Sequence, residues 1–211
     1  MSKLLSLLYL SYPLAIHFAI PLGHLSLALF WLAGLLLVSA VRERLCLKKF
    51  TPAFFVYLLF ATVVFVLAGN YPEQLAKFIP LIIYTSLFSL FAVSLGAGKV
   101  PLITAFASLM RGQVAADLPP QVQRYTRGLT LVWCGLFLLL GVLSLLLALY
   151  APIYLWSLFT NVISYIIIGL VFLLEIGIRK RLVGEYMDYG IKDFLQRLAT
   201  VDFSHLFRPS K

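Results

Sequence analysis

The sequence predicts an all-α, polytopic membrane helical bundle of about six transmembrane helices, accompanied by amphipathic interfacial helices. First, 62% of the 211 residues are hydrophobic and 12% are charged, whereas a soluble domain has roughly 25% charged residues. Second, the mean hydropathy is +1.00. Third, the apolar residues form long runs with basic residues between them. A run of about 20 residues spans a bilayer core of about 30 Å at a helical rise of about 1.5 Å per residue.

Turn signals divide the apolar runs into the expected spans. Residues 4–41 are too long for one crossing, and Pro21 and Gly23 supply a break. The first span is short, so a re-entrant segment is an alternative there. The six spans are expected at about 4–20, 25–41, 52–69, 75–95, 127–149 and 156–178, within a bundle covering residues 1–181.

Two further segments have the composition of surface helices. Residues 102–111 are too short to cross a membrane and carry their large apolar residues on one helical face, so we expect an interfacial helix. These residues are Leu102, Ile103, Phe106, Leu109 and Met110. Residues 182–211 are richer in charge, and we expect them to form a cytoplasmic amphipathic tail.

The distribution of positive charge predicts the orientation. With six spans, every Lys and Arg except Lys77 falls on one side of the membrane. Cytoplasmic loops collect Lys and Arg, so both termini are expected in the cytoplasm. The net charge of +9 then follows from topology and from contact with anionic lipids, and nucleic acid is not expected as a partner. The basic surface comprises Arg42, Arg44, Lys48, Lys49, Arg124, Arg127, Arg179, Lys180 and Arg181.

Glu175 is the acidic residue within a predicted span. An ionisable residue inside a membrane is a functional hypothesis by default. However, Arg179 lies four residues later on the same helical face, which suits an ion pair. We favour a structural pair near the cytoplasmic interface over a ligand-binding role.

A polar stripe is predicted on the sixth span. Asn161, Ser164, Tyr165 and Gly169 recur with helical spacing, and the stripe continues to Glu175. Because lipid cannot satisfy their hydrogen bonds, this face is expected to point into the bundle. Helix packing is the favoured interpretation, and a polar groove for a lipid or acyl headgroup is the alternative.

Two histidines and two cysteines could bind a ligand or react, but few residues that could assist them lie nearby in the sequence. His17 and His24 flank the Pro21 turn, where interfacial hydrogen bonding is favoured over a proton relay or ligand pair. Cys46 is expected in a basic loop and Cys134 within a span, so no disulfide is expected. No third ligand accompanies the histidines, and neither a metal nor a cofactor is predicted.

Several catalytic motifs are absent from the sequence. It contains no paired-acid motif for magnesium diphosphate, no H-E-x-x-H, no G-x-S-x-G and no Walker loop. No catalytic residue is therefore assigned, and an intramembrane acyl or lipid transferase is the weaker functional hypothesis.

Residues 8–181 resemble a family of small bacterial membrane proteins encoded in gene clusters for aryl polyene pigments and related acyl-carrier-protein-dependent lipids. The resemblance departs from the family pattern at Lys99-Val100-Pro101, where the family has a Pro-Pro pair. It is carried by Tyr12-Pro13, Asp117-Leu118-Pro119-Pro120, Arg124-Tyr125-Thr126-Arg127, Val132-Trp133-Cys134, Leu155-Trp156, Asn161, Ser164-Tyr165, and Glu175 before Arg179-Lys180-Arg181.

The resemblance implies that the protein belongs to an acyl-lipid or polyene pathway of a bacterial inner membrane. Our first hypothesis is a non-catalytic accessory protein that binds or moves a lipid-linked acyl or polyene product at the cytoplasmic leaflet. Lys99-Val100-Pro101-Leu102-Ile103 and Trp133 are also distantly similar to the septation protein A family. That similarity implies the alternative, a structural envelope protein acting through partners. Membrane lipids, and proteins of lipid biosynthesis or of the envelope, are the implied partners.

Overall fold

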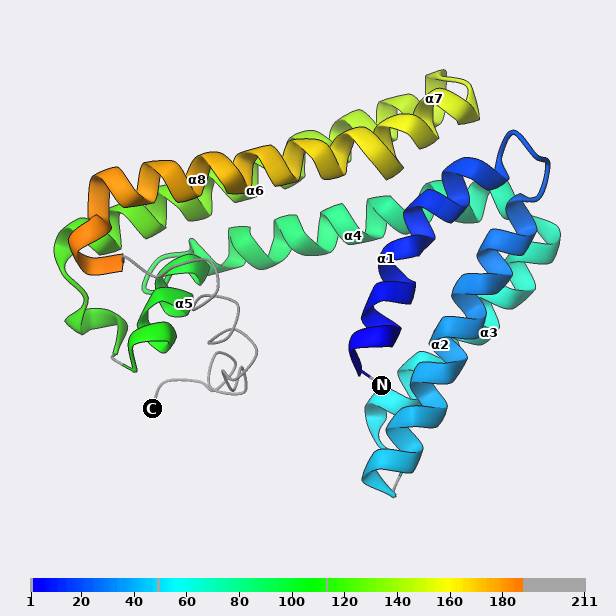
Figure 1. The fold of residues 1–211 in the computed structure, drawn as a ribbon, viewed down its shortest axis with the longest axis horizontal. Coiled ribbons are helices and arrows are strands. Elements are labelled where there is room, and N and C mark those ends of the chain that lie inside the picture. The colour runs from blue at the N-terminus through cyan, green and yellow to red at the C-terminus, as the bar shows by residue number, and fades with distance from the viewer. Residues whose placement is uncertain (1, 49, 113, 188–211) are drawn as a thin grey trace. The chain divides into compact units, whose positions relative to one another are not determined.

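The computed structural model describes residues 2–48, 50–112 and 114–187, and it confirms the predicted all-α class (Figure 1). Within these residues the elements are helices and the turns between them. In chain order they are α1 (Ser2–Ala19), α2 (Leu25–Leu47), α3 (Pro52–Asn70), α4 (Pro72–Ser94), α5 (Leu102–Arg111), the 3₁₀ turn η1 (Ala115–Asp117), α6 (Pro120–Tyr150), α7 (Ile153–Leu158), the π-helical turn η2 (Phe159–Ile163) and α8 (Ser164–Met187).

In the part of the chain that the structure describes, five helical segments are long and apolar enough to cross a membrane, which makes the chain a multi-pass membrane protein. They are α2, α3, α4, α6 and the continuous segment Ile153–Arg179. Many of their large apolar side chains are exposed, as contact with lipid requires. The sixth span stays a prediction, because the apolar part of α1 is the shorter stretch Leu7–Ala19.

The turns at Pro21 and between Tyr150 and Ile153 lie where the sequence predicts them. The basic segments differ from the prediction, because the helices continue through them. α2 extends to Leu47, so Cys46 lies on a helix and not in a loop. Leu, Arg and Lys are good helix formers, and adding a turn to an existing helix is far easier than starting one.

The predicted tail begins as part of α8, which continues to Met187. The remainder of the tail, residues 188–211, lies outside the described residues, as do Lys49 and the side chain of Lys180.

The chain forms two compact units, and three helices contribute to both. Unit 1 comprises Met1–Ile83 and Gly141–Ile167, and unit 2 comprises Tyr84–Leu140 and Ile168–Lys211. In unit 1, α2 packs against α3 and α1 packs against α2. Small residues allow close helix approach in a membrane, and the unit 1 core combines several of them with a fully buried Trp156. This core contains Ile16, Leu25, Ala28, Leu29, Ala33, Val64, Ala68, Leu75, Ala76 and Trp156.

The connection between α2 and α3 uses its own polar groups. The Thr51 hydroxyl oxygen caps α3 by accepting the Phe54 amide at 3.2 Å, and the same hydroxyl donates to Glu43 Oε1 at 3.2 Å. The Arg44 guanidinium lies 4.4 Å from the centre of the Phe50 ring. The polar and charged groups of this basic segment therefore contact other residues of the same segment.

Candidate functional site

Helix α5 in unit 2 is held against α6 by hydroxyl groups. Thr126 Oγ1 donates to the Val122 carbonyl oxygen at 2.8 Å and lies 2.7 Å from Thr104 Oγ1. Because the Thr126 proton is directed at the carbonyl, Thr104 is the donor of the pair. The Ile103 amide donates to Thr130 Oγ1 at 3.4 Å. These contacts fix the start of α5 beside the first turns of α6.

The bounds of α5 confirm the predicted helix at residues 102–111, while its position at the membrane interface stays a prediction. Its small-residue face is the one that packs most tightly. Thr104, Ala107 and Ser108 are buried, and Ala107 joins a cluster of buried residues with Leu118 and Val122. Most of the larger apolar side chains, such as Ile103, are half-buried. The helix thus keeps an apolar flank while its small face lies against the protein.

Two connections bring further groups beside the start of α6. Between α4 and α5, Gly98 has a φ of 72°, which glycine adopts readily, and the following Lys99 amide donates to the Gly96 carbonyl at 3.1 Å. Between α5 and α6, the side-chain amide nitrogen of Gln123 (Nε2) donates to the backbone carbonyl oxygens of Ala116 at 3.3 Å and Leu118 at 2.8 Å. Hydrogen bonds therefore shape both connections.

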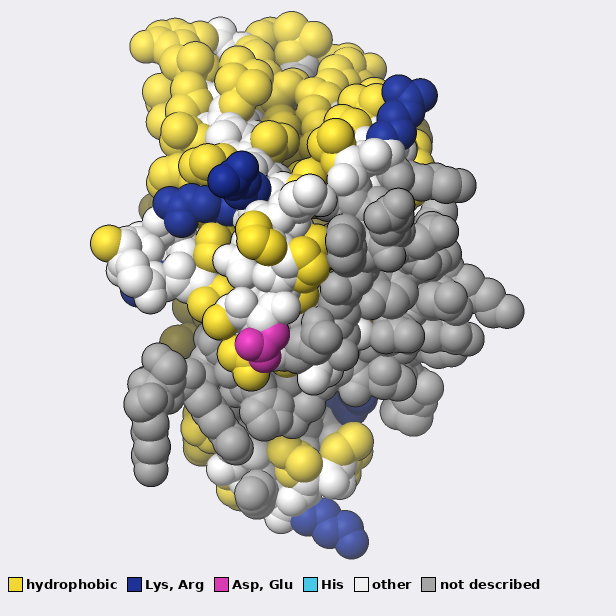
Figure 2. All heavy atoms as spheres, turned by 90° about the vertical axis from the view of Figure 1, so that its left-hand side faces the viewer, with side chains coloured by type: hydrophobic (Ala, Val, Ile, Leu, Met, Phe, Trp, Pro, Cys, Tyr) yellow, Lys and Arg dark blue, Asp and Glu magenta, His cyan; other side chains and the backbone are white. Residues whose placement is uncertain are grey.

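Between these connections and α6 lies a groove with a volume of about 440 Å³, which we call the basic groove. Lys99, Arg124 and Arg127 are all exposed along it, and no lining residue is acidic. Figure 2 faces this end of the chain and shows dark blue Lys and Arg side chains beside hydrophobic surface. The groove is lined by Lys99, Val100, Pro101, Thr104, Ala115, Ala116, Pro120, Gln123, Arg124 and Arg127.

Among the side chains that the structure describes, no carboxylate forms an ion pair with the three cations of the basic groove. Like charges around one opening repel one another and attract anions. The charge of the groove therefore favours an anionic ligand, and its volume falls in the range of small-molecule pockets, about 300–1,000 Å³. The sequence predicts Arg124 and Arg127 on a basic surface, but it does not predict that they line a groove.

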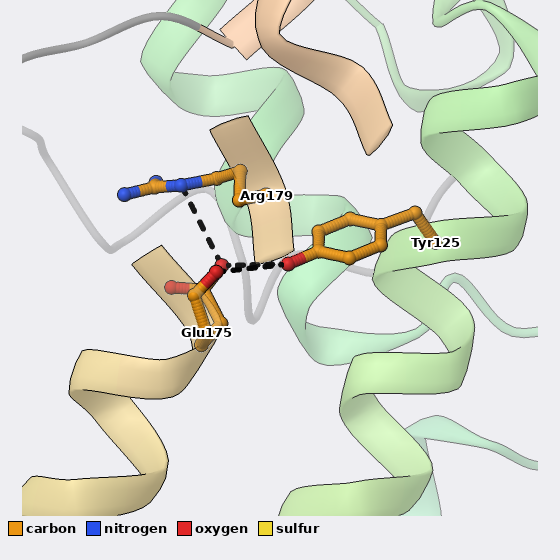
Figure 3. Close-up of polar contacts among 3 residues, drawn as sticks. All are labelled: Tyr125, Glu175 and Arg179. Atoms are coloured by element: carbon orange, nitrogen blue, oxygen red, sulfur yellow. Dashed lines mark hydrogen bonds and ion pairs between the residues drawn. The ribbon is translucent and has the colours of Figure 1, made fainter. Parts of the chain in front are cut away.

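A second charged cluster in unit 2 links α6 to α8 (Figure 3). The Tyr125 hydroxyl donates to Glu175 Oε1 at 3.1 Å, and Arg179 Nε lies 3.5 Å from the same oxygen. The predicted pair of Glu175 and Arg179 is thereby confirmed. Tyr125 is an additional partner that the sequence does not indicate. The prediction that Arg179 lies on the basic surface is wrong, because its side chain is buried, where Glu175 compensates its charge.

Unit 1 contains a neutral polar cluster around the π-helical turn. Asn161 Nδ2 donates to Ser157 Oγ at 3.1 Å, and His17 Nδ1 lies 3.2 Å from the same oxygen. The Ser164 hydroxyl donates to the Thr160 carbonyl at 2.7 Å. Ser157, Thr160, Asn161 and Ser164 are buried on one face, so this face uses much of its hydrogen-bonding capacity within the protein.

The predicted polar stripe is correct for Asn161, Ser164 and Glu175 but wrong for two residues between them. Tyr165 is 49% exposed, and Gly169 is exposed as well. A π-helical turn adds about one residue to the turn and shifts the faces that follow. The buried face also includes Ser157 and Thr160, which precede Asn161.

The two histidines have different surroundings. His17 contacts Ser157, and its ring centre lies 5.3 Å from that of Tyr154. His24 is exposed in the turn before α2. Among the residues that the structure describes, no three His, Cys, Asp or Glu side chains are grouped so that they could hold a metal ion.

Comparisons with family models, curated proteins and solved structures give no match. Function must therefore be argued from the geometry of the chain. Of the polar sites described, the basic groove combines an open volume with charges that have no ion-pair partner among the described residues.

Proposed function

We propose that this protein is a non-catalytic membrane protein that binds the anionic headgroup of a lipid, or of a lipid-linked acyl product, in the basic groove. The single observation that carries the proposal is the set of three cations around an open groove with no acidic lining residue. Arg forms paired hydrogen bonds to phosphate, and Lys adds a compact positive charge. Anionic lipid headgroups present such phosphate groups at a membrane surface.

The position of the groove along α6 supports a headgroup ligand. Arg124 and Arg127 lie in the first turns of this 31-residue helix, and the apolar part of the helix follows them. Cations at such a position are at the depth of lipid headgroups. The charge distribution of the sequence predicts that this is the cytoplasmic leaflet, and the family resemblance implies a bacterial inner membrane.

The apolar flank of α5 provides a surface along which the acyl chains of the lipid can lie. The groove includes the start of α5 at Pro101, and half-buried apolar residues follow directly. A headgroup in the groove can therefore keep its acyl chains in the membrane. The resemblance to proteins of aryl polyene clusters supports a lipid-linked product as cargo.

An intramembrane transferase is not supported by the polar cluster in unit 1. Ser157 is the hydroxyl closest to His17, and it is 0% exposed. A nucleophile must reach its substrate, and this hydroxyl is enclosed by protein. The cluster is better explained as helix packing.

Lipid-dependent thermal stability of the purified full chain tests the proposal. Phosphatidylglycerol added to detergent micelles should raise the unfolding temperature, because a ligand at 100 times its Kd stabilises the folded state by about 2.7 kcal/mol. Phosphatidylcholine should have little effect. The variant Arg124→Ala/Arg127→Ala should lose the response to phosphatidylglycerol.

The variant Arg42→Ala/Arg181→Ala is the matched control. It removes the same charge from two exposed arginines outside the groove and should respond as the wild type does. Equal responses of the two double variants would show that overall charge, and not the groove, attracts the lipid.

A further inference from the structure

We infer that the basic groove selects headgroups ending in a phosphomonoester, which carries close to two negative charges, over singly charged phosphodiester headgroups. This inference rests on the proposed function and specifies its ligand class. It follows from three features of the groove. These are the number of its cations, their placement on two walls, and the fact that its neutral polar side chains already form hydrogen bonds within the protein.

The number of cations exceeds what one phosphodiester can neutralise. Lys99, Arg124 and Arg127 line the same groove without an acidic lining residue. A phosphodiester brings one negative charge, whereas a phosphomonoester brings about 1.5 to 2 near neutral pH. The second charge interacts favourably with all three cations, so it contributes more here than in a site with one cation.

The cations stand on two separate walls. Arg124 and Arg127 are three residues apart on α6, which places them on one helical face. Lys99 belongs to the connection between α4 and α5, which is shaped by the turn at Gly98. A phosphomonoester has three terminal oxygens and a phosphodiester has two. The third oxygen lets one phosphate accept from the arginines and from the lysine together.

The neutral polar side chains of the groove already have partners. The Thr104 hydroxyl is paired with Thr126, and the Gln123 amide nitrogen donates to two backbone carbonyls. These donors hold the walls of the groove in place. The three cations are therefore the groups that recognise the headgroup. They discriminate headgroups by negative charge and not by the hydroxyl groups of a glycerol or sugar.

Binding of matched lipids to the purified full chain tests this selectivity. Phosphatidic acid, phosphatidylglycerol and phosphatidylcholine with identical acyl chains are added to detergent micelles, and bound lipid is counted by native mass spectrometry. At pH 8 we expect phosphatidic acid to bind about tenfold more tightly than phosphatidylglycerol, because it carries the additional charge. Inorganic phosphate at the same concentration should bind far more weakly than phosphatidic acid.

The pH dependence gives an independent readout of the second charge. The second pKa of a phosphomonoester is about 6, so lowering the pH from 8 to 5 removes most of that charge. The preference for phosphatidic acid should therefore shrink towards unity at pH 5, while phosphatidylglycerol binding changes little. A preference that is constant with pH would overturn the inference.

Lys99→Ala tests the second wall. It should reduce phosphatidic acid binding more than phosphatidylglycerol binding, by about threefold in the ratio. Lys77→Ala removes a lysine that does not line the groove and should leave the ratio unchanged. An unchanged ratio in Lys99→Ala would contradict the role of the lysine.

The remaining outcomes separate this inference from the proposed function. Equal binding of both anionic lipids, lost in Arg124→Ala/Arg127→Ala, would overturn the selectivity and leave the proposed function standing. No preference for either anionic lipid over phosphatidylcholine would overturn both. Inorganic phosphate binding as tightly as phosphatidic acid would assign the groove to a soluble phosphate compound and overturn a lipid ligand.

Discussion

Two charged clusters of unit 2 use neighbouring residues of one helix in opposite ways. Tyr125 on α6 donates a hydrogen bond to Glu175 on α8, and Glu175 pairs with Arg179 on the same helix. Arg124 and Arg127, on either side of it in sequence, line a groove without an acidic residue. One cluster is buried and internally paired, and the other is exposed and has no ion-pair partner among the described residues.

The difference separates charges that build the structure from charges that remain available to a ligand. A buried charge is tolerated when an opposite charge and hydrogen bonds compensate it. Glu175 and Arg179 meet this condition, so their cluster contributes mainly to holding α6 and α8 together. Exposed cations contribute little to folding, so the arginines of the basic groove should matter for binding and not for stability.

The largest expected loss of stability comes from breaking the buried pair. Glu175→Ala removes the acid that Arg179 and Tyr125 share, and we expect a loss of about 3 kcal/mol. The measurement is reversible unfolding in mixed micelles of mild detergent and sodium dodecyl sulfate. A loss below about 0.5 kcal/mol, the range of ordinary surface substitutions, would show that this cluster does not stabilise the bundle.

A smaller loss is expected when only the hydroxyl of Tyr125 is removed. Tyr125→Phe deletes the donor to Glu175 and should cost about 1 kcal/mol, the usual contribution of a hydrogen bond. Tyr150→Phe is the control, because Tyr150 is 82% exposed. If both variants unfold at the same denaturant concentration, the hydrogen bond between α6 and α8 carries no net stability.

The contact between α5 and α6 should contribute less again. Thr104→Val removes the hydroxyl that pairs with Thr126 while keeping a similar shape, and we expect a loss of about 0.6 kcal/mol, as for other hydrogen bonds between membrane helices. Thr62→Val is the control, because Thr62 is exposed and its hydroxyl bonds only its own helix. A larger loss of stability in Thr62→Val than in Thr104→Val would show that the hydrogen bond between Thr104 and Thr126 does not stabilise the contact between α5 and α6.

The smallest effect on stability is expected at the basic groove. Without added lipid, Arg124→Ala/Arg127→Ala should change the free energy of unfolding by less than about 0.5 kcal/mol, because both arginines are exposed. A loss comparable to that of Glu175→Ala would show that the two clusters do not differ in role.

Local patterns in the sequence predict much of the fold and part of the candidate site. The bounds of α5 and the pairing of Glu175 with Arg179 both follow from residues a few positions apart on one helix. Proline and glycine mark the turn after α1, because they disfavour a continuous helix. These features depend on local backbone preferences and helical periodicity.

Contacts between distant segments could not be predicted in the same way. Tyr125 meets an acid 50 positions later, and the groove forms only when the connection carrying Lys99 lies beside the first turns of α6. The π-helical turn at Phe159–Ile163 changes the buried face without an obvious sequence signal. Sequence spacing therefore does not show that Tyr165 is exposed or that Ser157 and Thr160 are buried.

Lipid retained on extraction from the native membrane tests the central claim most directly. The wild type, Arg124→Ala/Arg127→Ala and Arg42→Ala/Arg181→Ala are purified in mild detergent, and co-purifying phospholipids and acyl products are quantified per chain by mass spectrometry. We predict that the wild type and the second variant retain anionic lipid and that the groove variant loses it. Equal retention by all three proteins would contradict a headgroup site in the basic groove.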